Sequence, residues 1–405
     1  MSAFPYETSE PVYRPQPQDP HTFPEPMAQD QSVLDLISSP HPKFYTRLLN
    51  LNSRLGPKAK EYNMLNPHNP IQLLGKAEFM NPGMSHKDRI AKSMLLLAQS
   101  RGDLLNSDGK KKTILAASSG NTGCSLALVG TLLGYEVIVI TNKKCSQEKR
   151  DHIKANGATL WMSEDLQEEV DCLHGVHCYM QQEHVLCEKF PEKYFKVNQY
   201  DNLDNMAAHL ESTGREIWEQ TGGKITHFVM AGSTGGTIMG VGRYLKSKRA
   251  NCEIVLSDPE KSNLMGLWEM DREISSPDCG EERLQKVKES TAANGGVQLE
   301  GAGKGSLTAI MRSGVGALET VDACVPVNDF DAFDECRALA KTGVMCGGSS
   351  GLNICAARVI AERCADLGPQ EGGYTITTIL CDHGVKYMSK IYNDKWMQEN
   401  DTRCK

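Results

Sequence analysis

One lysine occupies a position in the sequence where its amine could act as a reagent. Lys87 lies in residues 81–89 (NPGMSHKDR), a polar turn that runs directly into the apolar helix pattern of Ile90, Met94 and Leu97. A lysine at such a junction is usually a surface charge or a helix cap. When a lysine is buried beside apolar groups, however, its pKa falls and the neutral amine can attack an aldehyde to form a Schiff base.

Three glycine-rich turns follow Lys87, and each lies between a strand-like apolar run and a helix-like pattern. They are residues 118–123 (SSGNTG), 232–237 (GSTGGT) and 347–351 (GGSSG). Such turns present backbone N–H groups at the positive end of a helix, and these groups bind phosphate and carboxylate. One reactive amine and three such turns are what an enzyme needs to carry pyridoxal phosphate as a Schiff base.

These four motifs, in this order and at these separations, resemble the fold-type II pyridoxal-phosphate enzymes, in particular the cysteine synthase and cystathionine β-synthase group. The resemblance covers about residues 40–396. The family writes the lysine motif as Asn-Pro-Gly-Gly-Ser-Val-Lys-Asp-Arg, whereas this chain has Met84 at the second Gly and His86 at the Val. Both departures lie beside Lys87 and bear on substrate identity. The C-terminal stretch 387–397 is more similar to cystathionine β-synthase than to cysteine synthase.

The resemblance implies a role for each motif. Lys87 would form the Schiff base and then remove and return the substrate Cα proton. Asn121 would bond the ring oxygen of the cofactor, and Ser349 would face its pyridine nitrogen. The phosphate would be held by Gly232, Ser233, Thr234, Gly235, Gly236 and Thr237. The substrate carboxylate would be bound by Ser118, Ser119, Gly120, Thr122 and Gln199.

Each turn also has a purely structural interpretation. Residues 232–237 could be a plain strand-to-helix connection, since glycine-rich turns are common in α/β folds. Ser119 or Asn121 could cap a helix, and Ser349 could cap the helix expected over 351–366. For the 118–123 turn the two interpretations are compatible, because one residue can cap a helix and bind a ligand.

The resemblance further implies a reaction. A hydroxyl partner such as Ser349 leaves the pyridine nitrogen largely unprotonated, which favours prompt loss of a β leaving group to give an aminoacrylate. We therefore expect β-replacement on L-serine or an activated serine such as O-acetylserine with a sulfur nucleophile. Homocysteine would give cystathionine and sulfide would give cysteine. The alternatives are a specialised β-elimination or β-substitution lyase with another nucleophile, and a non-catalytic sensor that kept the pocket.

Composition excludes several other classes of protein. The net charge is −7 over 405 residues and basic residues are scattered, which disfavours nucleic-acid binding. No apolar run approaches the ~18 residues needed to span a membrane. The 14 cysteines include no C-x-x-C pair, and the N-terminus has no signal pattern, so we expect a cytoplasmic, reducing location. The expected partners are amino-acid substrates and, from the resemblance, a second copy of the chain in a homodimer.

Apolar, β-branched runs alternate with helical patterns along the chain, which predicts an α/β fold of parallel sheets flanked by helices. The expected strands are 113–116, 136–141, 158–161, 227–231, 253–256 and 375–380. The expected helices are 122–134, 146–155, 204–220, 236–248, 329–341 and 351–366.

The resemblance divides this fold into two lobes with the cofactor between them. Residues 85–200 would form the smaller α/β lobe, and residues 41–84 plus 201–396 the larger. Residues 1–40 are predicted to be a disordered, acidic, Pro-rich tail, and residues 397–405 a short tail. Residues 260–305 are weakly patterned and are expected to form an excursion or loop.

Six potential metal ligands gather within sixteen residues. They are Cys172, His174, His177, Cys178, His184 and Cys187. Their spacing is not that of a zinc finger, and 164–183 is expected to be a helix, so we predict buried thiols and surface histidines without a metal. His86 and His383 could contact the cofactor or substrate, or simply pack. Lys304 could lie at the entrance of the site, or be an exposed charge.

Overall fold

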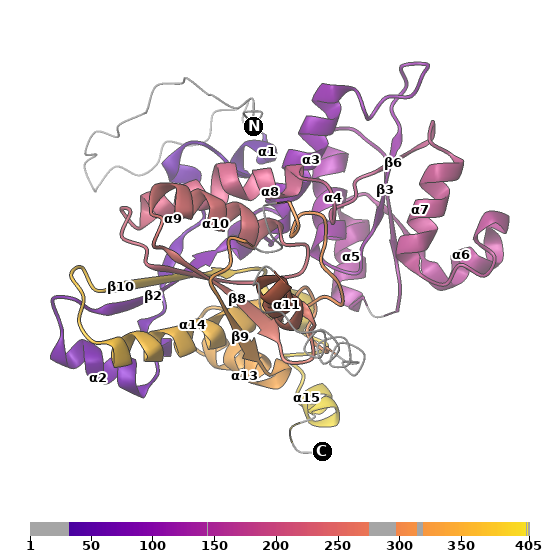
Figure 1. Cartoon of the computed structure of the whole chain (residues 1–405). Coiled ribbons are helices and arrows are strands. Elements are labelled where there is room, and N and C mark those ends of the chain that lie inside the picture. The colour runs from indigo at the N-terminus through magenta and orange to yellow at the C-terminus, as the bar shows by residue number, and fades with distance from the viewer. Residues whose placement is uncertain (1–31, 144, 275–296, 314–318, 402, 404–405) are drawn as a thin grey trace. The chain divides into compact units, whose positions relative to one another are not determined.

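The strands form a six-stranded and a four-stranded sheet among the described residues of the computed structural model (Figure 1), which are 32–143, 145–274, 297–313, 319–401 and 403. The larger sheet has the order β1-β2-β10-β7-β8-β9 and the smaller has the order β5-β4-β3-β6. Neighbouring strands are parallel except β1 and β2, which are antiparallel. The strands are β1 (Leu48–Asn50), β2 (Ile71–Ala77), β3 (Thr113–Ala117), β4 (Val137–Thr141), β5 (Thr159–Met162), β6 (Tyr194–Lys196), β7 (His227–Ala231), β8 (Glu253–Pro259), β9 (Ala323–Val327) and β10 (Tyr374–Leu380).

Helices connect the strands. The α-helices are α1 (Val33–Leu36), α2 (Pro57–Leu65), α3 (Lys87–Arg101), α4 (Asn121–Leu132), α5 (Gln147–Ala155), α6 (Ser163–Glu169), α7 (Tyr179–Lys189), α8 (Asp204–Ala208), α9 (Arg215–Gln220), α10 (Gly236–Lys248), α11 (Leu264–Ile274), α13 (Asp329–Ala340), α14 (Gly348–Leu367) and α15 (Asp394–Asn400). Shorter 3-10 turns are η1 (Pro42–Phe44), η2 (Asn52–Arg54), η3 (Glu78–Met80), η4 (Asp171–Leu173) and η6 (Gly384–Tyr387), and a π-helical turn, η5 (His209–Gly214), lies between α8 and α9.

The larger sheet is covered on both faces, so the side chains of its central strands β7 and β10 are buried on both sides. Figure 1 shows α8, α9 and α10 on one side of this sheet and α2, α13 and α14 on the other. Strand β7 divides its side chains accordingly: Phe228 and Met230 join the hydrophobic cluster of α10, while Val229 and Ala231 join that of α14. Alternate residues of a strand point to opposite faces, so a strand buried on both faces must be apolar at every position.

The predicted α/β class with parallel sheets is confirmed, and every expected strand and helix of the alternating pattern is present within a few residues. Strands β1, β2, β6 and β9 were not predicted. In β2 the sequence IQLLGKA carries Gln72 and Lys76, which made it look unlike a buried strand. The lobe boundaries drawn from the resemblance stay a prediction.

Several other expectations need correction. The helix expected over 164–183 is broken into α6, η4 and α7, with Gly175 in the left-handed region between them. The weakly patterned stretch 260–305 contains helix α11, and its residues 275–296 lie outside the described residues.

Both predicted tails were drawn too long. Of the predicted tail 1–40, residues 1–31 lie outside the described residues, but Ile37 is fully buried in the core. At the other end α15 continues to Asn400 with Met397 buried, so the predicted tail 397–405 begins too early.

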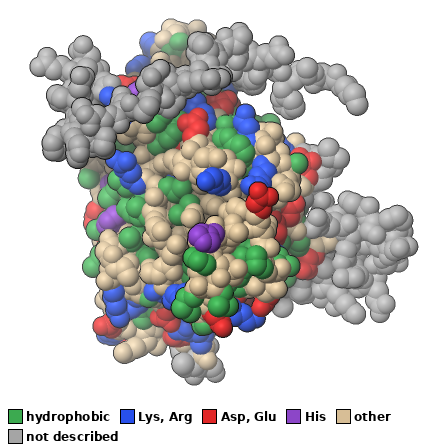
Figure 2. Space-filling model, turned by 90° about the vertical axis from the view of Figure 1, so that its left-hand side faces the viewer, with side chains coloured by type: hydrophobic (Ala, Val, Ile, Leu, Met, Phe, Trp, Pro, Cys, Tyr) green, Lys and Arg blue, Asp and Glu red, His purple; other side chains and the backbone are tan. Residues whose placement is uncertain are grey.

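Basic residues are scattered on the face of the molecule that Figure 2 shows. On that face, Lys and Arg side chains are interspersed with Asp and Glu side chains. Within the described residues, no helix is both long and apolar enough to cross a membrane.

Candidate active site

The lysine motif and two of the three glycine-rich turns follow the carboxyl ends of parallel strands. The third turn, 347–351, was expected to follow a strand as well, but it follows helix α13. The lysine loop follows β2, and the turns 118–123 and 232–237 follow β3 and β7. Strand β10 ends beside them at Leu380, and the next residues join two of these loops: the His86 N–H donates to the Cys381 carbonyl at 2.9 Å, and Gly347 N–H donates to the Asp382 carbonyl at 3.1 Å. Ligands of parallel α/β sheets bind at this edge.

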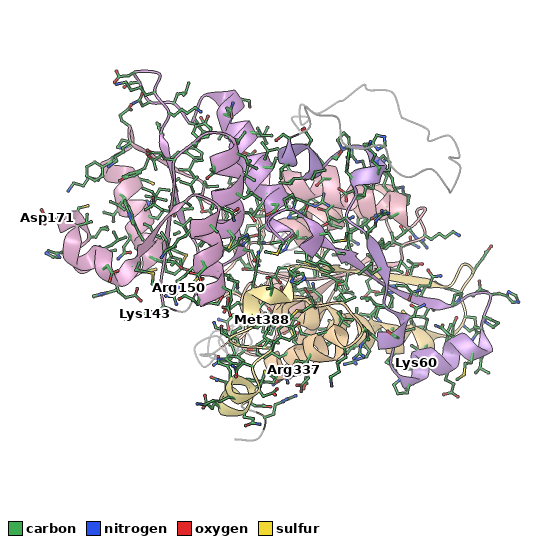
Figure 3. All side chains as sticks on the ribbon, turned by 180° about the vertical axis from the view of Figure 1, so that it is seen from behind. Lys60, Lys143, Arg150, Asp171, Arg337 and Met388 are labelled. Carbon is green, nitrogen blue, oxygen red and sulfur yellow. The ribbon has the colours of Figure 1, made fainter. Side chains whose placement is uncertain are left out.

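The segment after β10 also joins the two sheets. Ser146, the N-cap of α5, donates its hydroxyl to the Lys386 carbonyl at 3.1 Å, and the Ser389 N–H donates to Glu148 Oε1 at 2.9 Å. Figure 3 labels Met388, which lies in this segment, and Arg150, which lies in α5. Residues 381–389 therefore connect the lysine loop, the 347–351 turn and the helices of the smaller sheet.

Lys87 is the first residue of helix α3. Its backbone N–H donates to Ser85 Oγ at 3.0 Å, which satisfies one of the free N–H groups at the start of the helix. Removal of the amine from bulk water lowers the pKa of Lys87 to about 8, against the opposing effect of Cys381 and Asp382. A substantial fraction of the amine is then neutral near pH 8, as covalent attack on an aldehyde requires.

Gly83 and Asp88 give the lysine loop its shape. The Gly83 N–H donates to Asp88 Oδ2 at 2.6 Å, and Asp88 Oδ1 accepts from the Ser125 hydroxyl at 2.5 Å. A Cβ at Gly83 would lie 2.4 Å from Asp88 Oδ1, so no larger residue fits without moving this carboxyl. Burial raises the pKa of Asp88 to about 6. The loop is thereby attached to helices α3 and α4.

The two departures from the family motif have different structural consequences. Met84 adopts a φ of 57°, in the left-handed region that favours glycine, so the backbone is strained at the position where the family motif has Gly. His86 is buried, and its Nδ1 lies 3.1 Å from the Cys381 carbonyl oxygen. Burial lowers the pKa of His86 to about 3, which keeps the ring neutral.

A second buried histidine, His209, lies between His86 and the 232–237 turn. The ring of His209 lies 6.0 Å from that of His86, and its Nε2 is 3.1 Å from Thr237 Oγ1. Its Nδ1 is 2.9 Å from Thr213 Oγ1, and burial holds its pKa well below the ordinary value. Sequence reasoning missed His209, because it lies in the π-helical turn of a helix with no motif.

The turn 232–237 has the form of an anion site at the start of α10. Gly235 has a φ of 87°, and a Cβ there would lie 2.5 Å from Met311 Cγ. The Gly236 N–H contacts Thr234 Oγ1 at 3.3 Å, and Thr234 and Thr237 are buried. Gly232 is buried and Ser233 partly exposed, so the turn is lined by backbone and small hydroxyls. This composition fits a phosphate group at a helix N-terminus.

The turn 118–123 is organised by Ser118, whose Oγ accepts from the Gly120 and Gly123 N–H groups at 3.3 and 3.0 Å. Thr122 donates its hydroxyl to Gln199 Oε1 at 2.6 Å. The predicted carboxylate-binding residues Thr122 and Gln199 are therefore in contact, although they lie 77 positions apart. Ser119 is partly exposed beside them.

Asn121 is the centre of a polar group that we call the Asn121 cluster, made up of Asn121, Asp382, Lys386 and Tyr387. Asn121 Nδ2 donates to Asp382 Oδ2 at 2.7 Å, and Lys386 Nζ donates to Asn121 Oδ1 at 2.9 Å. Tyr387 donates its hydroxyl to Asp382 Oδ2 at 2.6 Å. The sequence marked Tyr387 through the family resemblance but gave no role to Asp382 or Lys386.

Ser349 lies in the first turn of α14, and its hydroxyl bonds the thiol of Cys381. Burial raises the pKa of Cys381 to about 12, so the neighbour of Ser349 is a neutral thiol. The helix begins three residues before the expected 351, and Ser349 is thus part of it. That this hydroxyl faces the pyridine nitrogen of the cofactor stays a prediction.

Comparison with known proteins identifies the family. The family model described as "Pyridoxal-phosphate dependent enzyme" matches residues 60–382. The chain belongs to this pyridoxal-phosphate dependent enzyme family. It is 34% identical over 334 residues to the cysteine synthase of Dictyostelium discoideum, covering 82% of this chain and 80% of the relative. It is also 34% identical over 332 residues to the mouse cystathionine β-synthase, covering 80% of this chain and 51% of that protein.

A solved structure supports the same assignment. The cysteine synthase of Entamoeba histolytica matches with a TM-score of 0.71 and 29% identity, covering 93% of this chain and 94% of that one. The predicted fold, a two-lobed fold-type II architecture, and the predicted cofactor, pyridoxal phosphate, are both confirmed. The described geometry fits this cofactor, since it combines an amine of lowered pKa with a small-residue anion turn. The roles of individual residues stay predictions.

Three other expectations concern residues near the site or outside it. His383 Nδ1 accepts from the Val385 N–H at 3.1 Å and caps η6, which gives it a structural role. Lys304 Nζ lies 4.0 Å from the centre of the Tyr200 ring, next to Gln199, and burial lowers its pKa. Among the described side chains, no group of three His, Cys, Asp or Glu is arranged to hold a metal ion, the Cys172–Cys187 stretch included.

Proposed function

We propose that the chain catalyses β-replacement on L-serine or O-acetyl-L-serine with a sulfur nucleophile. The observation that carries this proposal is the Lys87 amine, whose pKa is lowered to about 8 at the point where the lysine loop meets Cys381 and Asp382. The bound cofactor supplies an electron sink that stabilises negative charge at the substrate Cα. The relatives named cysteine synthase and cystathionine β-synthase support a sulfur nucleophile.

The residues of the chain divide the work between binding and proton transfer. Lys87 would hold the cofactor covalently and, once released from it, would take the proton from the substrate Cα. The turn 232–237 would hold the phosphate, and Asn121 would donate to the ring oxygen. Ser349 would offer the pyridine nitrogen a hydroxyl rather than a carboxylate, which would favour loss of the β substituent.

The substrate carboxylate is held at the start of α4. The backbone N–H groups of the 118–123 turn, that of Thr122 included, lie at a helix N-terminus, where a negative charge is stabilised. Gln199 orients Thr122 through the bond at 2.6 Å. We assign Ser118 to shaping this turn, because its Oγ is already engaged by two backbone N–H groups. Ser119, Gly120 and Thr122 are then the groups that contact the carboxylate.

The finer assignments are part of this proposal. The product is cysteine when the nucleophile is sulfide and cystathionine when it is homocysteine. We propose a homodimer in the cytoplasm, which sedimentation of the purified protein and localisation of a tagged chain would test.

A specialised lyase is the second candidate, and His86 is the observation that favours it. A neutral, buried imidazole adjoins Lys87 where the family motif has Val, and the strained Met84 lies two residues before it. Such an active site would release the β substituent but add a different nucleophile, or none.

The test is an absorbance scan of the purified protein, followed by addition of L-serine and then O-acetyl-L-serine. A cofactor band above roughly 400 nm that shifts with one of them identifies the leaving group. Sulfide and homocysteine are then added, and cysteine and cystathionine are measured by mass spectrometry. The variant Lys87→Ala is the control and should lose the band and at least roughly 10²-fold of the activity.

Three outcomes contradict the proposal at different levels. A band that ignores both amino acids excludes a serine-type substrate. A shifted band without a sulfur product favours the specialised lyase. Absence of any band after addition of pyridoxal phosphate favours a non-catalytic sensor.

A further inference from the structure

The Asn121 side chain is held at both ends by buried charges. Its Nδ2 faces the Asp382 carboxylate at 2.7 Å, and its Oδ1 faces the Lys386 amine at 2.9 Å. Asp382 is 0% exposed and Lys386 is 2% exposed. The two ends of an amide have the same shape but opposite hydrogen-bonding character, so neighbouring groups decide its orientation. A reversed amide would place its oxygen against the carboxylate and its NH₂ against the amine.

The same two residues connect the loops of the site. Lys386 Nζ donates to the Gly83 carbonyl at 2.8 Å, within the loop that carries Lys87. The Asp382 carbonyl accepts from Gly347 N–H at 3.1 Å, two residues before Ser349. Any movement of Lys386 or Asp382 is therefore transmitted to Asn121 and to the loops on either side of it.

Asp382 accepts one hydrogen of the Asn121 NH₂ group, and the Tyr387 hydroxyl also bonds the Asn121 side chain. We propose that Lys386 and Asp382 are positioning residues that fix the Asn121 amide with its NH₂ toward the ring oxygen of the cofactor. This inference rests on the role of Asn121 in the proposed function. A reversed amide would present an oxygen to the ionised ring oxygen and repel it, so the orientation decides whether this oxygen is stabilised as an anion.

Lys386 is surrounded by other titratable groups that bear on its charge. Burial lowers its pKa, while Cys124, Asp382 and Asp88 oppose this effect and Lys149 adds to it. His152 lies close enough for Lys386 to lower the pKa of that ring in turn. The amine thus loses its proton at a lower pH than an exposed lysine does, and spectra of the variants are compared below that pH, beginning at pH 7.

The experiment measures the pH at which the visible band of the bound cofactor changes, in the holoenzyme and without substrate. Lys386→Met removes the donor to Asn121 and should move the midpoint to higher pH by about one unit, because a hydrogen bond to the ionised oxygen is lost. Cofactor binding should weaken about tenfold. Lys386→Arg keeps a cationic donor and should restore most of both values. Lys395→Met, on the exposed face of α15, is the matched control and should change neither.

A double-mutant cycle separates positioning from a direct charge effect. In an Asn121→Ala background, Lys386→Met should shift the midpoint by less than about 0.3 unit, since there is no amide left to orient. An equal shift in both backgrounds would overturn the proposal, and so would the absence of a shift in Lys386→Met with native Asn121. If the Met variant does not fold, Lys386→Gln is used in its place. It removes the charge but keeps a polar side chain, and the same midpoint shift is measured.

This experiment is independent of turnover. If the wild-type holoenzyme binds the cofactor but replaces no β substituent, the proposed function fails while the midpoint shifts still decide the role of Lys386. If turnover is found and the midpoint does not depend on Lys386, the positioning role alone is wrong.

Discussion

Two groups of buried charges lie on either side of the lysine loop, and they differ in how completely they are satisfied. The first, which we call the charge quartet, is Lys76, Glu78, Arg89 and Glu216. Among the described residues, no polar side-chain atom of the quartet is buried without a partner. In the second, the Asn121 cluster, the Oδ1 atom of Asp382 is buried and has no hydrogen-bond partner among the described residues.

The quartet is a closed structural unit. Arg89 bonds Glu78 through Nε at 2.7 Å and Glu216 through Nη1 at 2.5 Å, and Lys76 lies 2.7 Å from Glu216. Two positive and two negative side chains cancel, and Asn81 at the start of the lysine loop donates to Glu78 Oε2 at 2.9 Å. Although burial alone would raise the pKa of Glu78, Arg89 and Lys76 hold it below the ordinary value.

This difference in hydrogen bonding suggests that the quartet has a structural role and that the Asn121 cluster has a role in ligand binding. A buried polar group with all its bonds made rigidifies the structure around it, whereas one with a bond left open is a candidate for contact with a ligand or for tuning. The quartet fixes both ends of the lysine loop, at Asn81 and Arg89. The Asn121 cluster touches the residues that are expected to meet the cofactor. The following predictions test this division, from the largest effect to the smallest.

The largest effect is expected from breaking the quartet. Arg89→Met leaves Glu78 and Glu216 as buried carboxylates with one fewer cation, and should lower the free energy of unfolding by about 3–5 kcal/mol. Urea unfolding of the holoenzyme measures it. The control is Lys58→Met, which breaks an exposed pair with Asp366 whose side chains are 60% and 61% exposed, and which should leave the free energy of unfolding nearly unchanged. Equal losses of unfolding free energy in the two variants would show that the buried quartet stabilises the protein no more than an exposed ion pair does.

The Asn121 cluster should contribute less to stability than the quartet. Asp382→Asn removes a buried charge whose Oδ1 is already unsatisfied, while it weakens the bonds from Asn121 and Tyr387. We expect a loss of about 2 kcal/mol in the same urea experiment. A larger loss than that of Arg89→Met would mean that the Asn121 cluster, and not the quartet, contributes more to stability. A Tyr387→Phe variant isolates the bond at 2.6 Å and should cost about 1 kcal/mol.

The contrast also explains what sequence could and could not predict. The glycine-rich turns were recognisable because their composition is needed locally: Gly83 leaves space for Asp88, and Gly235 has a positive φ. Lys76 and Lys386 look like ordinary surface lysines in the sequence. Their burial depends on partners that lie up to 303 positions away, as in the bond from Lys386 to the Gly83 carbonyl. No local pattern carries that information.

The same reasoning applies to the fold. The strands that were predicted, such as 227–231 and 375–380, are buried along their whole length and contain no Asp, Glu, Lys or Arg. Strand β2 was missed because Lys76 points into the quartet, so a charged residue interrupts the apolar run. The charged residue that β2 contributes to the quartet thus prevented its prediction as a strand.

His86 lies between the two groups, and a pH titration tests it. The unfolded chain binds a proton at this ring near pH 6.5, whereas the folded protein does so only near pH 3, so stability is lost as the pH falls between these values. Its contribution at pH 5.5 should be about 1.4 kcal/mol less than at pH 8. His86→Val, which restores the family residue, should flatten the wild-type slope over this window by one proton, as urea unfolding at several pH values would measure.

An unchanged slope in His86→Val would instead mean that the buried ring is protonated in the folded protein, and that it carries a positive charge beside Lys87.

Met84 should give the smallest effect, because two contributions of opposite sign nearly cancel. A side chain at a φ of 57° costs about 1–2 kcal/mol, which Met84→Gly relieves. Glycine in turn gains conformational freedom in the unfolded chain, worth roughly 0.5–1 kcal/mol. The net gain in unfolding free energy should be about 0.5 kcal/mol. Met84→Ala keeps the backbone strain and removes the same side chain beyond Cβ, so the difference between the two variants is the strain less the entropy contribution of glycine. If the Ala variant were more stable than the Gly variant by the full entropy contribution of roughly 0.5–1 kcal/mol, the left-handed backbone at this position would carry no strain. The departure from the family motif would then have to act through the Met side chain itself.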